Sequence, residues 1–153
     1  MNQRSIYINY VKPEHDDVLY LMTKSFRVRN NYSLFEALNQ AKKQQSNLSI
    51  WIIAPKEENP RNRVFFQRET ADLMSALQDY SNSIKITERT FDVQEIQNIG
   101  YVYLDKAYLR EDLEFSSKVI AFCKNNLINV IEVDSNVFVP TMIASNKEEY
   151  SAR

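Results

Sequence analysis

With 153 residues, the chain has the length of one ordinary globular domain, and its composition includes a single glycine, Gly100. A dinucleotide-binding loop needs three closely spaced glycines and a P-loop needs two, so the sequence provides neither kind of phosphate-binding loop. The net charge of −1 gives no overall basic character for nucleic-acid binding, and one cysteine with one histidine gives neither an internal disulfide nor a multi-cysteine or multi-histidine metal site.

The first third of the chain alternates between strand-like and helix-like patterns. Residues 1–17 are polar, with a short extended-looking stretch, and we interpret them as a lead-in segment. The apolar run 18–22 predicts a strand. A helix is predicted from Ser33, because Glu36 follows in capping-box spacing. The run 48–54, which ends before a proline, predicts the next strand.

The same alternation continues to residue 134. Pro60 marks the start of a predicted long helix over 61–80, because proline is favoured in the first turn of a helix. The remaining predicted elements are a short strand at 84–87, a short helix at 91–99, a strand at 100–104, a long helix at 111–126 and a strand at 129–133.

This order of elements predicts an α/β fold. Strands that alternate with amphipathic helices form βα units, and continuous apolar runs are typical of strands that are buried on both faces. We therefore expect a doubly wound, mainly parallel five-stranded sheet of the Rossmann-like type, with helices on both faces. Residues 18–134 would form this domain, and residues 135–153 would form a connector.

The expected ligand site lies at the carboxyl edge of the sheet. Ligands of such sheets bind beyond the carboxyl ends of the strands, beside the point where the strand order reverses. The residues predicted to line that crevice are Thr23, Lys24, Ser25, Phe26, Pro55 and Asp105. A turn-forming or capping role is the alternative for Asp105 and for Asp134. No catalytic or metal-ligating set is predicted.

Two arginines follow the first predicted strand. Arg27 and Arg29 could hold a phosphate or a carboxylate through paired hydrogen bonds, or they could tie their loop to a neighbouring domain. Both alternatives stay open on the sequence pattern.

Three motifs carry a resemblance to one family. Residues 18–34 resemble the opening motif of class II DNA photolyases, Y-W-M-x-R-x-x-R-V-R-D-N-W-A-L. The matching residues there are Tyr20, Met22, Arg27, Val28, Arg29, Asn31 and Leu34. Residues 133–153 resemble the family pattern V-D-x-H-N-I-V-P-x-W-x-A-S-x-K-x-E-Y-A-A-R, through Asp134, Val139, Pro140, Ala144, Ser145, Lys147, Glu149, Tyr150, Ala152 and Arg153. Between them, Asp105, Leu109 and Arg110 match T-D-F-S-P-L-R.

The resemblance implies part of a two-domain flavoprotein enzyme. In that family an N-terminal α/β domain can bind an antenna chromophore. A helical C-terminal domain binds FAD and damaged DNA and acts as a lyase, repairing pyrimidine dimers by light-driven electron transfer. The matched motifs belong to the N-terminal domain. We therefore expect a domain that holds a deazaflavin or folate type of antenna, scaffolds the FAD domain of the same polypeptide, or does both, and that is not catalytic alone.

The resemblance also implies an interdomain or structural role for certain residues. These are Arg27, Arg29, Asn31, Lys147, Glu149, Tyr150 and Arg153. The family's Asp and Trp in the first motif are Asn30 and Tyr32 here, and Asn30 cannot hold an arginine by charge. This departure is compatible with an altered photolyase activity in the longer protein that the resemblance implies.

One alternative function and one location complete the expectations. The alternative is a non-photochemical module of the same fold that binds a small nucleotide or a protein partner. No apolar run approaches the roughly 18 residues that span a bilayer, and residues 1–17 do not have the pattern of a signal peptide. We therefore expect a cytoplasmic protein without a membrane partner.

Overall fold

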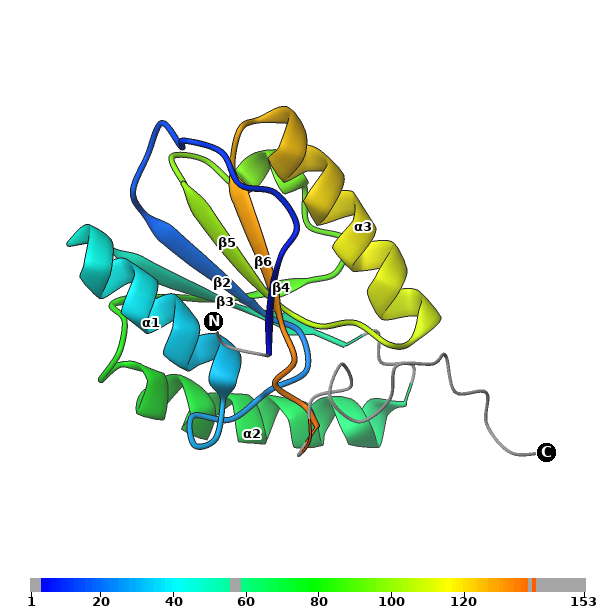
Figure 1. The fold of residues 1–153 in the computed structure, drawn as a ribbon. Helices are drawn as coiled ribbons and strands as arrows, with labels where there is room; N and C mark the ends of the chain where they lie inside the picture. Colours follow the sequence, from blue (N-terminus) through cyan, green and yellow to red (C-terminus); the bar gives the residue numbers. More distant parts are fainter. Residues whose placement is uncertain (1–3, 56–58, 138, 140–153) are drawn as a thin grey trace.

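In the computed structural model, which describes residues 4–55, 59–137 and 139, six strands form one sheet in the order β1-β6-β5-β2-β3-β4 (Figure 1). The strands are β1 (Ser5–Tyr7), β2 (Val18–Met22), β3 (Leu48–Ala54), β4 (Ser83–Glu88), β5 (Tyr101–Asp105) and β6 (Asn129–Val133). All neighbouring pairs are parallel except β1 with β6. The predicted α/β fold with a mainly parallel sheet is confirmed.

The prediction of five strands was wrong by one strand. The lead-in segment contributes β1, which pairs antiparallel with β6 so that Ser5 lies opposite Val133. With three residues and one partner, β1 is an edge strand, and such a strand needs no buried apolar run of its own. The structure therefore joins part of residues 1–17 to the domain predicted at 18–134.

Helices cover both faces of the sheet, as predicted. Helices α1 (Tyr32–Gln44) and α2 (Pro60–Leu77) pack on one face, and α3 (Arg110–Asn125) packs on the other (Figure 1). Pro60 occupies the first turn of α2, as predicted, and Asn59 caps it by accepting a hydrogen bond from the amide of Arg61. None of the helices in the described residues is long and apolar enough to cross a membrane.

Two helix predictions need correction. Helix α1 is capped by Asn31 and not by Ser33, because the Asn31 side chain accepts a hydrogen bond from the amide of Leu34. The predicted helix at 91–99 is only a 3-10 turn, η1 (Val93–Glu95). Asn98 adopts a φ of 57°, which is the left-handed region, so a right-handed helix cannot continue through it.

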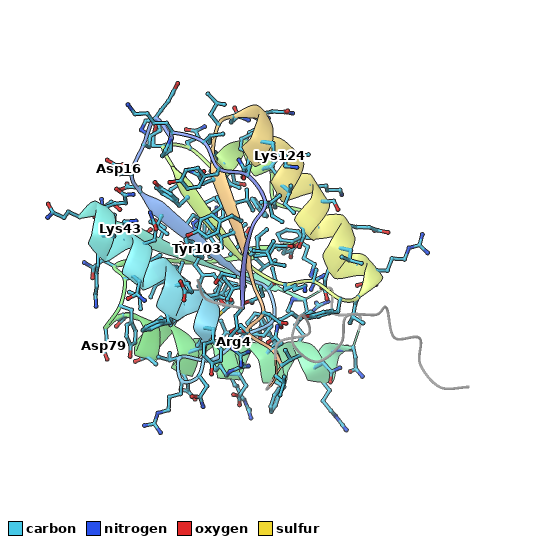
Figure 2. All side chains as sticks on the ribbon, viewed as in Figure 1. Arg4, Asp16, Lys43, Asp79, Tyr103 and Lys124 are labelled. Carbon is cyan, nitrogen blue, oxygen red and sulfur yellow. The ribbon has the colours of Figure 1, made fainter. Side chains whose placement is uncertain are left out.

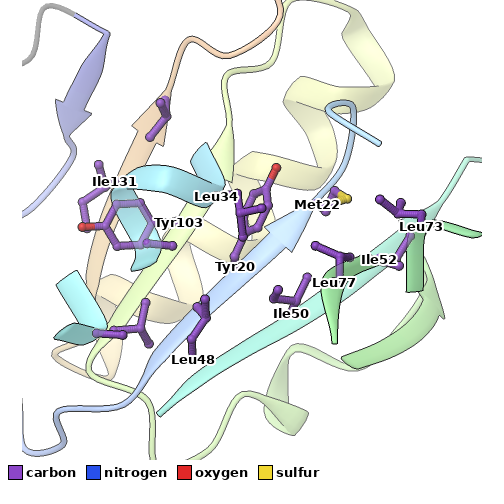
Figure 3. Packing of buried hydrophobic residues seen from close by; sticks show 14 residues of the cluster. Tyr20, Met22, Leu34, Leu48, Ile50, Ile52, Leu73, Leu77, Tyr103 and Ile131 are labelled. Atoms are coloured by element: carbon purple, nitrogen blue, oxygen red, sulfur yellow. The ribbon is translucent and has the colours of Figure 1, made fainter. Parts of the chain in front are cut away.

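The core consists of two apolar layers that share the central strand β2. Its five residues are all buried. Val18, Tyr20 and Met22 face the layer under α1 and α2 (Figure 3), and the two leucines between them face the layer under α3. A strand that is buried on both faces needs apolar residues at every position, and this explains why the run 18–22 has no polar alternation.

A thiol and a phenol buried in the core lower the stability of the folded protein at alkaline pH. Burial raises the pKa of the Cys123 thiol to about 12, and it also raises the pKa of Tyr103. Both groups stay neutral in the folded state after the unfolded chain has begun to lose these protons. Their contribution to stability is therefore complete below about pH 9 and is lost as the pH rises.

We expect the free energy of unfolding to fall steadily between pH 9 and pH 11. Cys123→Val removes the thiol from this balance, so its fall between pH 9 and 10 should be smaller by about 1 kcal/mol. Urea unfolding at several pH values measures both proteins. Identical slopes in the two proteins would contradict the assignment to Cys123.

Candidate functional site

The strand order reverses between β2 and β5, which lie side by side at the centre of the sheet, with Leu21 opposite Leu104. The loop after β2 and the last residue of β5 therefore meet at the carboxyl edge. Of the predicted crevice residues, this geometry brings together Thr23, Lys24 and Ser25 from the loop with Asp105 from β5.

The Asp105 carboxylate binds the backbone of that loop. Its Oδ2 accepts hydrogen bonds from the amides of Thr23 at 3.0 Å, Lys24 at 2.9 Å and Ser25 at 3.0 Å. Asp105 is only 1% exposed. Three successive amides around one anion form a backbone anion-binding cradle, and here a carboxylate of the protein itself fills it. The geometry thus gives Asp105 the turn-forming role.

The other oxygen of Asp105 is also fully used. Its Oδ1 accepts from the hydroxyls of Tyr20 at 2.9 Å and Ser33 at 2.6 Å. Ser33 therefore lies inside α1 with its hydroxyl turned to Asp105, and this explains why it does not cap the helix. Burial raises the pKa of Tyr20, and the charge of Asp105 raises it further, so Tyr20 is a neutral donor at every physiological pH.

Asn31 closes the loop from the other side. Its Nδ2 donates to the carbonyls of Ser25 at 3.0 Å and Arg27 at 2.9 Å, while its Oδ1 accepts from the amide of Leu34 at 2.9 Å. One buried carboxamide therefore fixes both the end of the loop and the start of α1.

The segment after β6 is tied to the same loop. Arg27 donates to the carbonyl of Ser135 at 2.7 Å, and the hydroxyl of Ser25 donates to Oδ1 of Asn136 at 2.9 Å. In return, Oγ of Ser135 accepts from the amide of Tyr32 at 2.9 Å. These bonds give Arg27 a structural role within the domain.

A second arginine, Arg4, also binds this segment. Arg4, labelled in Figure 2, donates to the carbonyls of Asp134 at 3.1 Å and Val137 at 2.9 Å. Its guanidinium carbon also lies 4.1 Å from the centre of the Tyr32 ring, in cation–π contact. The first residues beyond the sheet are therefore held in place by two arginines, one before β1 and one after β2.

The remaining predicted residues lie elsewhere. Phe26 packs edge to face on Phe66 of α2, with ring centres 5.5 Å apart, and so belongs to the core. Pro55 is half-buried after β3, and Arg29 is exposed. Lys147, Glu149, Tyr150 and Arg153 lie outside the described residues.

The rim of the carboxyl edge holds a charge cluster that the sequence did not predict. Asp112, in the first turn of α3 and 5% exposed at its side chain, pairs with Lys24 at 3.0 Å and with Arg89 at 2.5 Å. Two cations thus share the one carboxylate of Asp112 near the positive end of the α3 dipole. The Nε of Arg89 is also buried without a hydrogen-bond partner.

One signal in the sequence pointed to part of this cluster. Arg89 lies just beyond the carboxyl end of the strand predicted at 84–87, and an acidic residue in a first helical turn, such as Asp112, is favoured by the helix dipole. Their pairing joins segments that are distant in the chain. Among the described residues, no group of three or more His, Cys, Asp or Glu side chains is placed to hold a metal ion.

Comparison with known proteins adds a family and a likeness in fold to solved structures. The family model described as DNA photolyase matches residues 18–153. A solved protein of the universal stress protein family from Burkholderia pseudomallei is similar in fold, with a TM-score of 0.50 and 12% sequence identity. The alignment covers 78% of this chain and 96% of that one. At this identity the likeness concerns the fold alone. No curated protein matches the sequence.

Proposed function

The chain belongs to the DNA photolyase family, and on this premise we propose that it is the N-terminal domain of a class II photolyase-like protein that holds an antenna chromophore and supports the FAD domain of the same polypeptide. The observation that carries the proposal is the family match, which extends from β2 through β6 and on to residue 153. The motifs at residues 18–34 and 133–153 support the class II assignment.

The charge cluster of Lys24, Arg89 and Asp112 at the rim of the carboxyl edge supports the antenna role. An antenna passes on excitation energy, so its domain has to bind and orient a chromophore and needs no acid, base or nucleophile. Asp105 already fills the amide cradle. We therefore place an acidic group of the chromophore, such as the carboxylates of a folate, beside Lys24 and the unpartnered Nε of Arg89.

The tied segment after β6 supports the scaffold role. Arg4 and Arg27 fix residues 134–137 against the loop that follows β2. A chain that continues toward an FAD domain would thus leave the sheet from a defined place. The loop after β2 and the start of the connector are then joined by hydrogen bonds.

Equilibrium dialysis with a methenyl-folate and with a deazaflavin, followed by absorption spectroscopy, tests the antenna role. We expect one of the two chromophores to be retained at a one-to-one ratio. Arg89→Lys keeps a cation beside Asp112 but removes the Nε donor, so retention should weaken about tenfold. Arg110→Lys, at a side chain of α3 that is 93% exposed, is the matched control and should retain the chromophore unchanged.

Failure of the unaltered domain to retain either chromophore would reject the antenna role and leave the scaffold role. Equal retention by Arg89→Lys and the unaltered domain would reject the placement at the rim.

A further inference from the structure

Helix α2 has one buried face and one exposed face. Its buried residues are Thr70, Leu73 and Leu77, which all lie in the second half of the helix. On the exposed side, Val64 is 49% and Phe65 is 65% accessible to solvent. In Figure 1, α2 runs along an outer side of the molecule, with the sheet on one side of it only.

The exposed face carries a regular stripe of side chains. Residues 61, 65, 68, 72, 75 and 79 alternate in steps of four and three, which is the spacing of side chains that meet in paired helices. We call this stripe the α2 seam; its members, all exposed, are Arg61, Phe65, Arg68, Asp72, Ser75 and Asp79. Asp79 lies just beyond the end of α2 and points outward (Figure 2).

The charges along the α2 seam oppose the dipole of their own helix. The two arginines lie toward the positive N-terminal end and the two aspartates toward the negative C-terminal end, and α2 has neither an acidic residue in its first turn nor a basic one in its last. Such an order weakens a lone helix slightly. None of the four takes part in the ion pairs formed between described residues. Of the four, only Arg68 and Asp72 have the i,i+4 spacing at which opposite charges favour their own helix, so the order as a whole contributes little to this domain.

The α2 seam is complementary to itself when reversed. If a second α2 lies antiparallel, with a two-fold axis level with residue 70, Arg61 meets Asp79 of the second copy and Arg68 meets Asp72. Phe65 then meets the small Ser75, and each contact occurs twice because the axis repeats it. We propose that two copies of this chain form a two-fold symmetric dimer through antiparallel pairing of their α2 seams.

Other occupants fit the seam less well. A parallel pair of α2 helices would place arginine against arginine. The phosphates of a nucleic acid would suit Arg61 and Arg68 but would be repelled by Asp72 and Asp79, and would leave Phe65 in water. Only a partner with the reversed order of charges satisfies both halves of the stripe, and a second copy has that order. This inference does not depend on the proposed antenna function.

The dimer should be weak. Helix α2 has 18 residues and is therefore about 27 Å long, and one helix pair of this length buries less surface than a standard stable interface. Its contacts are also mostly exposed ion pairs, which are individually weak. We expect concentration-dependent association at high micromolar concentration.

Sedimentation equilibrium of the whole 153-residue chain, between about 5 and 500 µM, tests the proposal. Arg68→Asp places aspartate against aspartate at two symmetric contacts and should raise the dissociation constant about tenfold. Asp72→Arg should do the same. The double variant with both changes restores two opposite-charge pairs and should return to within about threefold of the unaltered chain.

Lys118→Asp, an equal change of charge on the exposed side of α3, is the matched control and should not alter association. Phe65→Ala tests the apolar contact and should weaken the dimer severalfold. Circular dichroism establishes that each variant is folded.

A chain that stays monomeric throughout would overturn the proposal, as would single reversals without effect or a double variant that does not recover. A monomer that binds a 20-base-pair DNA duplex through Arg61 and Arg68 would replace it with a nucleic-acid surface.

Discussion

Replacing Asp105 with alanine should lower the free energy of unfolding by about 3–5 kcal/mol. The change removes the acceptor of three loop amides and two hydroxyls, all at a site where Asp105 is 1% exposed. Buried polar groups that lose their partner keep the cost of leaving water, and this cost is larger for groups that bonded a charge. The effect should exceed that of any single change on the surface of the domain.

Asp105→Asn is the matched comparison. Its carboxamide oxygen can still accept from the amides of Thr23, Lys24 and Ser25, and its NH₂ can donate to the hydroxyl oxygens on the other side. We therefore expect a loss of about half that of alanine. Urea unfolding followed by circular dichroism measures both variants at neutral pH. A loss below about 1 kcal/mol for Asp105→Ala would show that the cradle does not organise the loop.

Gly100→Ala should be nearly as damaging, with a loss of about 3 kcal/mol. A Cβ at this position would lie 1.8 Å from the carbonyl oxygen of His15 and 2.8 Å from its carbonyl carbon. Both are backbone atoms, so no side-chain rotation relieves the overlap. The amide of Gly100 also donates to the carbonyl of Asp17 at 2.9 Å, which ties this strand entry to the segment that would have to move.

A change two residues earlier gives the control for Gly100. Asn98 has a φ of 57°, so Asn98→Gly removes a strained conformation in the same loop and should be neutral or slightly stabilising. Thermal and urea unfolding of both variants, side by side, measure the difference. If Gly100→Ala were as stable as the unaltered chain, the close approach to His15 would not be a constraint.

The buried strands could be predicted from the sequence to the residue. β2, β3 and β6 have the predicted bounds, and the signal is strongest in β2, which is covered on both faces and is apolar at every position. β3 and β6 are mainly apolar but include Ser49 and Glu132. β1 could not be predicted as part of the sheet. It has three residues and one neighbour, and the register that places Ser5 opposite Val133 is a long-range property of the fold.

The place of the candidate site could be predicted, but not the partners of its residues. The topology rule brings Thr23, Lys24 and Ser25 to Asp105, yet residue type alone does not say that the amides bind the carboxylate and leave none for a ligand. Likewise Asn31 and Ser33 are both good capping residues. Asn31 caps α1 because its carboxamide also satisfies two loop carbonyls.

The filled cradle of Asp105 has a consequence for any anion that approaches this edge. Asp105 is a tethered competitor: it is held beside the three amides by the sheet, so its effective concentration there far exceeds the millimolar levels that a free anion can reach. A phosphate would have to displace a ligand that loses no translational freedom on binding. In other doubly wound folds, amides at this edge of the sheet are open to a nucleotide phosphate, whereas here the Asp105 carboxylate already occupies them.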